Sequence, residues 1–190
     1  MNHKTLKSKP ADISRFTLHA SRSVSRGFTL LEALVSIFIL TLTIVAPMSI
    51  ASSTLFNSTV AKEQVTAFYL AQEAIEGVRS MRDGNGLEGR AWLDSLPLAT
   101  NFTIDVVNPT SGKPTISNCP SGICDYIKYD LDDHLYQHVS GDFSNFIRTV
   151  RIDSVPSNPS NEVAISVTVS WNIGKISRTF VARENVFNWQ

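Results

Sequence analysis

This chain of 190 residues has few cysteines, no formal net charge and none of the short motifs of known enzymes. Two cysteines are too few for a small protein held together by a framework of disulfides. Seventeen basic and seventeen acidic residues give a formal net charge of zero, without the large basic excess typical of nucleic-acid-binding proteins. The sequence contains no nucleophile-elbow serine, phosphate-binding loop, dinucleotide fingerprint or zinc-protease motif. We therefore expect no enzyme, no cofactor, no metal site and no nucleic-acid partner.

The charge is unevenly distributed along the chain. Residues 1–27 contain six Lys or Arg and one Asp, a net charge of +5. Residues 28–190 contain eleven basic and sixteen acidic residues, a net charge of −5. A basic amino-terminal segment before an apolar one is typical of a membrane protein that keeps its amino end in the cytoplasm.

An apolar run from Phe28 to Leu55 follows the basic segment. As a helix it would be roughly 42 Å long, enough to span a hydrocarbon core of about 30 Å. A cleaved signal peptide is the rival interpretation, with Ser49-Ile50-Ala51 as its small-x-small site. The run is longer than the apolar core of about 7–15 residues in such peptides, so the sequence favours a transmembrane helix with the following body outside.

Glu32 is the only charged residue between Arg26 and Lys62. A carboxylate within a bilayer costs several kcal/mol unless it finds a partner. In one interpretation Glu32 lies near the cytoplasmic interface and reaches the lipid headgroups. In the other it pairs with a cation inside the membrane, such as the new amino terminus of a neighbouring chain cut just upstream.

The segment Arg26–Glu32, which reads Arg-Gly-Phe-Thr-Leu-Leu-Glu, resembles the processing motif of type IV prepilins. In that family a prepilin peptidase cuts after the Gly that ends a basic leader, and it methylates the new first residue, usually Phe. The fifth residue of the cut chain is Glu. The resemblance implies cleavage between Gly27 and Phe28, N-methylation of Phe28 and an assembly role for Glu32. The leader, residues 1–27, is longer than many in the family, so either the start codon is misassigned or the leader is simply long.

The predicted long helix, residues 28–83, has two parts. Residues 28–55 form the transmembrane or filament-core part, in which Pro47 predicts a kink because it removes one backbone hydrogen bond. Residues 56–83 are amphipathic, and we expect their apolar stripe to pack on a sheet. The stripe consists of Val65, Phe68, Ala71, Ile75 and Val78. Asp83-Gly84-Asn85-Gly86 predicts the helix end.

The remaining residues, 84–190, change to the period-two pattern of strands. Alternation predicts strands near 102–106, 125–131, 146–152, 163–171 and 176–183, with Arg148 on the apolar face of the third. We expect an α+β protein: a long amino-terminal helix packed on an antiparallel sheet of four or five strands. The resemblance to type IV pilins implies the same architecture, a ladle. The ending Val186–Trp189 also resembles endings of pilin-like proteins.

Two further groups of residues are candidates for chemistry. Cys119 and Cys124 lie close together in a Pro/Gly loop, and a disulfide is the expected state outside the membrane; free thiols are expected in a reducing compartment. Residues 130–138 hold the densest set of potential metal ligands, with three Asp and two His. They lack the glycine and spacing of a calcium loop, so we interpret them as a solvated turn.

The resemblance implies a structural subunit, and we expect a minor subunit of a type IV pilus. The segment Tyr69–Asp83 also resembles the helix of minor pilin-like proteins. The implied partners are the prepilin peptidase and methylase, other pilin subunits, an inner-membrane assembly platform and membrane lipid. A type II secretion pseudopilin is the alternative within the class, and a membrane-anchored binding domain that never polymerises is the alternative outside it. The expected location is a single-pass inner-membrane protein, then an extracellular pilus or a periplasmic pseudopilus.

Overall fold

The computed structural model describes residues 27–110 and 112–188, so the leader before Gly27, and Trp189, lie outside the described residues. The chain divides into two compact units between Ser49 and Ile50. The described part contains one long helix, α1, and one seven-stranded antiparallel sheet. The predicted fold class, α+β with a long amino-terminal helix, is confirmed.

Helix α1 spans Leu30–Leu87 and ends four residues later than the sequence predicted. The stop lies at Gly89, whose φ of +67° is the left-handed conformation that favours glycine. The Gly89 amide bonds the Gly86 carbonyl at 3.0 Å, and the Arg90 amide bonds the Asn85 carbonyl at 2.8 Å. These two bonds form a Schellman cap. Buried Asn85 adds a bond from its side-chain nitrogen to the Asp94 carbonyl at 2.8 Å, which continues the helix past Gly84.

The sheet has seven strands where the sequence predicted four or five. Their bounds are β1 Asn101–Thr110, β2 Lys113–Asn118, β3 Tyr126–Tyr129, β4 Tyr136–Gln137, β5 Asp142–Ser154, β6 Glu162–Ile173 and β7 Ile176–Phe187. A short 3-10 turn, Pro120–Gly122, follows β2. The two strands missed are β2 and β4. Their sequences, with a proline in β2 and only two residues in β4, carry little alternation to detect.

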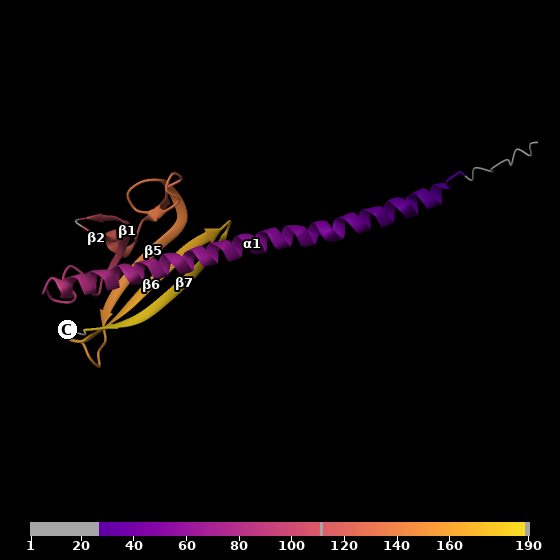
Figure 1. Ribbon diagram of the computed structural model, residues 1–190. Coiled ribbons are helices and arrows are strands. Elements are labelled where there is room, and N and C mark those ends of the chain that lie inside the picture. The colour runs from indigo at the N-terminus through magenta and orange to yellow at the C-terminus, as the bar shows by residue number, and fades with distance from the viewer. Residues whose placement is uncertain (1–26, 111, 189–190) are drawn as a thin grey trace, which may run out of the picture. The chain divides into compact units, whose positions relative to one another are not determined.

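Strand β5 is the centre of the sheet, as Figure 1 shows. One edge of β5 pairs with β6, from Phe146–Trp171 to Ser154–Val163, and β6 pairs in turn with β7. Two hairpins share the other edge. The hairpin β3–β4 pairs with the first half of β5, and the hairpin β1–β2 pairs with it at Val150 and Arg151. The two hairpins therefore lie end to end along β5.

The core lies between the sheet and the carboxyl-terminal part of α1, which crosses it in Figure 1. The predicted alternation on β6 is confirmed, because its apolar side chains are buried: Val163, Ile165, Val167, Val169 and Trp171. The predicted helix stripe was partly wrong. Val65 and Phe68 are about half exposed, and the buried face instead contains small residues such as Ala67, Ala74 and Gly77. A Cβ on Gly77 would lie 2.8 Å from Val106 Cγ1, so the absence of a side chain lets helix and sheet approach closely.

Arg148 on β5 is a buried charge in this core, with 1% of its side chain exposed. Its Nη1 donates to the Leu70 carbonyl of α1 at 3.0 Å and lies 3.2 Å from Glu73 Oε2. Its Nη2 donates to the Ile104 carbonyl of β1. Burial lowers the pKa of Arg148, and the Glu73 carboxylate opposes that shift. One side chain thus ties α1, β1 and β5 together.

Candidate functional site

The amino-terminal part of α1 presents apolar side chains to its surroundings on every face. Every residue from Gly27 to Leu55 is exposed, including Phe28 with 76% of its surface. The helix is long and apolar enough to cross a membrane, with a mean hydropathy of 2.3 over its most apolar 18 residues. A surface of this size and composition is stable only against lipid or against other apolar helices.

Thr29 caps the start of the helix. Its Oγ1 accepts the backbone amide of Glu32 at 3.2 Å, and its carbonyl accepts the amide of Ala33 at 3.1 Å. Thr29-Leu-Leu-Glu32 is the Thr-x-x-Glu spacing of a capping box. The sequence analysis missed this role, although the spacing signals it. Because the cap lies after the Gly27–Phe28 bond, cleavage there would leave the helix start intact.

Glu32 lies in the first turn of α1, where a carboxylate is also favoured by the positive end of the helix dipole. It uses its backbone amide for the cap, and no side-chain bond joins its carboxylate to any residue the structure describes. Threonine hydroxyls deeper in the helix bond the backbone, as Thr41 does with the Phe38 carbonyl and Thr43 with the Leu40 carbonyl, both at 2.8 Å. Glu32 is the one charged side chain among the described residues between Gly27 and Ala61.

Pro47 lies inside α1, and the division of the chain into two units falls just past it. Proline has no amide hydrogen for the carbonyl one turn earlier, that of Thr43. The predicted kink at Pro47 stays a prediction.

Residues 22–46 match the family described as the prokaryotic N-terminal methylation motif. This chain carries the type IV prepilin signature. Together with the exposed apolar helix, the signature supports a type IV pilin-like or pseudopilin protein and points to a structural protein. It implies processing by a prepilin peptidase and assembly with other pilins, and it is consistent with membrane anchoring. No curated protein and no solved structure matches the chain.

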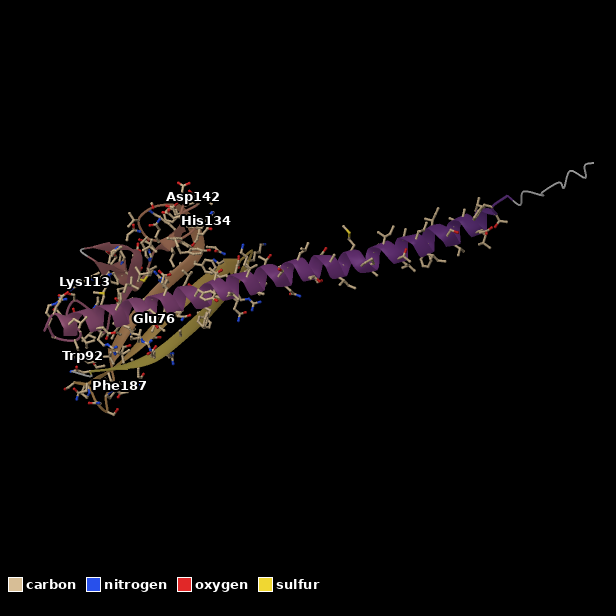
Figure 2. The ribbon with its side chains drawn as sticks, in the orientation of Figure 1. Glu76, Trp92, Lys113, His134, Asp142 and Phe187 are labelled. Atoms are coloured by element: carbon tan, nitrogen blue, oxygen red, sulfur yellow. A yellow bond between two sulfur atoms is a disulfide. The ribbon has the colours of Figure 1, made fainter. Side chains whose placement is uncertain are left out.

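The structure places the other candidate residues in the second compact unit, which begins at Ile50 and contains the sheet; we call it the sheet unit. Cys119 and Cys124 form a disulfide with their Cα atoms 4.5 Å apart. It closes the loop between β2 and β3, and so it joins the two hairpins that share the edge of β5. In Figure 2 the labelled His134 and Asp142 lie at the opposite end of the sheet from Trp92 and Phe187.

The potential ligands of residues 130–138 do not converge. Asp130 accepts the Asp132 amide at 3.0 Å and the Gln137 side-chain amide at 2.9 Å, which form a turn. His134 Nδ1 lies 3.2 Å from the Tyr129 hydroxyl. Among the residues that the structure describes, no group of three or more His, Cys, Asp or Glu is placed to hold a metal ion.

Asp105 is a buried carboxylate that the sequence analysis did not single out. Burial alone would raise its pKa, but backbone amides of His138, Asn108 and Val107 donate to it and hold the pKa below its usual value. The neighbouring His138 shares a hydrogen bond with the Thr103 hydroxyl. Burial, reinforced by the charge of Arg148, lowers the pKa of His138 to about 4, so this imidazole is neutral at physiological pH. This polar network fixes β4 against β1.

Proposed function

We propose that this protein is a minor subunit of a type IV pilus. The observation that carries the proposal is the methylation motif at residues 22–46, because it lies where a basic leader meets an exposed apolar helix. In this proposal the peptidase cuts between Gly27 and Phe28, and the amine of Phe28 is methylated. The varied body, and the resemblance of Tyr69–Asp83 to minor pilin-like helices, favour a minor over a major subunit.

Charge supplies the physical logic of assembly. Cleavage removes the leader with its net charge of +5 and creates a cationic amine on Phe28. Phe28 precedes the helix and is exposed, and the Glu32 carboxylate is free of side-chain bonds to described residues. In a bundle of such helices, Glu32 of one subunit pairs with the Phe28 amine of its neighbour. Two charges that are costly in a bilayer then offset each other and set the register between subunits.

The expected partners and location follow from the same proposal. The subunit is anchored in the inner membrane by residues 28–55, with the sheet unit outside the cytoplasm. Other pilin subunits and an inner-membrane assembly platform take up the processed chain. The final location is an extracellular pilus.

The test is the intact mass and amino-terminal sequence of the protein extracted from membranes. We expect a start at Phe28 with the mass of one added methyl group. A start at Met1 would leave a plain anchor, and a start near Ser52 would mean a secreted protein; either contradicts the proposal. Gly27→Leu is the matched control. The variant is expected to stay uncut because the motif requires Gly before the cut. It is expected to fold because a Cβ at Gly27 would lie within 4 Å of no described atom.

Deletion of the gene separates the pilus from the secretion alternative. Loss of piliation with normal protein secretion supports a pilus subunit. Lost secretion with normal pili would instead identify a type II secretion pseudopilin, since the prepilin signature is common to both classes. A retained leader with a functional outer body would support a membrane-anchored domain that does not polymerise.

A further inference from the structure

A cavity of about 380 Å³ lies where the two hairpins meet on the sheet. It is bounded by the end of β2, the start of β3 and the disulfide loop between them. Phe102, Ile104 and Ile127 of these hairpins point into the core beneath α1. Side chains alternate across a strand, so Thr103 of β1 and Lys128 of β3, which line the cavity, point to the opposite face. The cavity therefore opens on the face of the sheet opposite the carboxyl-terminal part of α1.

Three polar side chains of this cavity are free to bind a ligand. They are the Ser117 hydroxyl, the Asn118 amide and the Asp125 carboxylate. None of them makes a side-chain hydrogen bond to any residue within 27–110 or 112–188. Together they offer both donors and acceptors, with one charged acceptor in Asp125. The Cys119–Cys124 disulfide holds the two short segments that carry them, so their spacing is fixed before a ligand arrives.

Two aromatic rings flank these polar groups. Phe143 is 73% exposed and Tyr126 is 43% exposed, although each belongs to a strand of the sheet. Lys128 places its Nζ 5.6 Å from the centre of the Phe143 ring and donates to the Val139 carbonyl at 3.0 Å. The Lys128 ammonium therefore already has a carbonyl and an aromatic ring as contacts. Exposed aromatic faces beside hydroxyl, amide and carboxylate groups without side-chain hydrogen bonds suit a ligand that has both C–H faces and many hydroxyls.

We propose that this cavity binds a neutral sugar ring, either free or at the end of a glycan chain. The volume falls within the range of about 300–1,000 Å³ of small-molecule sites and accommodates one ring with a few waters. Asp125 and Asn118 bond the ring hydroxyls, and the face of the Phe143 ring that the Lys128 ammonium does not cover stacks on the C–H face of the sugar. The lining carries one carboxylate, Asp125, and one ammonium, Lys128, and His138 is neutral at physiological pH, so the cavity has no net charge and favours a neutral ligand over an anion.

This site goes beyond the proposed pilus function and does not depend on it. A chain that stays uncut could still bind the sugar, and a chain without a sugar site could still be cut and assembled. The N-terminal mass therefore tests one proposal, and sugar binding tests the other.

The experiment is saturation-transfer NMR on the full chain in a detergent without a sugar headgroup, because a glycoside detergent would occupy the site. The probes are neutral hexoses and N-acetylhexosamines, with their β-linked and α-linked oligosaccharides. We expect at least one to bind with a Kd of about 1 mM or below. Tighter binding of an oligosaccharide than of its terminal unit identifies a glycan chain as the ligand, whereas equal binding identifies the single ring.

Variants locate the binding. Asp125→Asn keeps the shape of the exposed side chain and is expected to weaken binding about tenfold through loss of a charged acceptor. Phe143→Ala is expected to weaken it about fivefold. Asp142→Asn is the matched control, since Asp142 is an exposed carboxylate next to Phe143 that does not line the cavity, and binding should stay within about twofold.

Three results would overturn the proposal. The first is the absence of a signal from every sugar at about 10 mM. The second is binding that Asp125→Asn and Phe143→Ala leave unchanged while the circular-dichroism spectrum and thermal midpoint match those of the parent. The third comes from protein-observed spectra of the same chain: resonance shifts of the cavity residues with inorganic phosphate or calcium but not with any sugar, which would assign the cavity to an ion.

Discussion

The Thr29 hydroxyl accepts the backbone amide of Glu32 at 3.2 Å, which leaves the Glu32 side chain outside the cap. The cap of the helix and the charge of its first turn thus reside on two residues, three positions apart, with separable roles. Thr29 accepts a backbone amide at the start of the helix, and a bilayer requires such amides to be hydrogen-bonded. Glu32 adds a charge, which the backbone hydrogen bonds of the helix do not need. Substitutions at the two positions can therefore be read independently.

Glu32→Gln should leave membrane insertion and cleavage intact and should reduce incorporation into filaments about tenfold or more, because the Phe28 amine loses its counter-charge. Its backbone amide still bonds Thr29, so the helix start is preserved. Immunoblots of sheared filaments and of membranes measure the two pools. Thr29→Ser, which keeps the cap, is the control. Equal incorporation of Glu32→Gln and the parent would show that the carboxylate serves only the helix dipole or the headgroups.

Gly77→Ala should destabilise the sheet unit by about 1–3 kcal/mol, because the new Cβ would lie 2.8 Å from Val106 Cγ1 and 2.9 Å from Ile104 Cδ1. Gly84→Ala on the same helix is the matched control. Its Cβ would meet no described atom within 4 Å, so we expect a gain of up to about 1 kcal/mol from helix propensity. Urea unfolding of the full chain in micelles, followed by the fluorescence of buried Trp171, measures both. A neutral Gly77→Ala would mean that α1 packs less closely on β1.

The apolar helix and the prepilin signature could be predicted from sequence because their signals are local. The apolar run, Glu32 and the residues around Gly27 each depend on a few neighbours in the chain, and the fold class follows from the change of period after the helix. The strong alternation of β6, with Val163 to Trp171, likewise needs only its own residues. The number of strands could not be predicted from local pattern alone, because the two residues of β4 form a strand by pairing with Tyr129 and Lys128 of β3.

Features that depend on distant contacts could not be predicted from sequence. The helix passes Gly84 because Asn85 finds carbonyls of Trp92 and Asp94, which local propensity does not encode. The buried face of α1 is set by the close approach that Gly77 permits. The cavity beside the disulfide exists only because two hairpins share one edge of β5.

Arg148→Met should destabilise the sheet unit by about 2 kcal/mol or more, because the partly buried Glu73 carboxylate loses its cation and the Leu70 and Ile104 carbonyls lose their donor. Arg148→Met combined with Glu73→Gln should recover part of the loss. Burial already raises the pKa of Glu73 against the opposing charge of Arg148, and removing Arg148 should raise it further. A raised carboxyl pKa means that the folded state binds the proton more tightly. The variant's deficit should therefore shrink as the pH falls through that raised pKa toward the ordinary value of 4.5, and a deficit independent of pH would refute this account.

The Cys119–Cys124 disulfide closes a short loop, so its removal should cost only about 2 kcal/mol. Cys119→Ser/Cys124→Ser should lower the urea midpoint by a corresponding amount and leave the fold intact. Reductant should lower the midpoint of the parent to that of the double variant, and it should leave the double variant unchanged. A parent insensitive to reductant under unfolding conditions would show that the thiols are free in the isolated protein.

His138 should make the sheet unit less stable in acid. Its pKa is about 4 in the folded protein against an ordinary 6.5, chiefly because it is buried, with the charge of Arg148 adding to the shift and Asp105 and Asp125 opposing it. The unfolded state therefore binds the proton more tightly, and the contribution present above pH 6.5 is lost progressively as the pH falls toward 4. His138→Gln retains a polar group near the Thr103 hydroxyl but does not titrate. The urea midpoint of the variant should fall less steeply than that of the parent between pH 6.5 and 4. Parallel curves would mean that other groups carry the acid sensitivity.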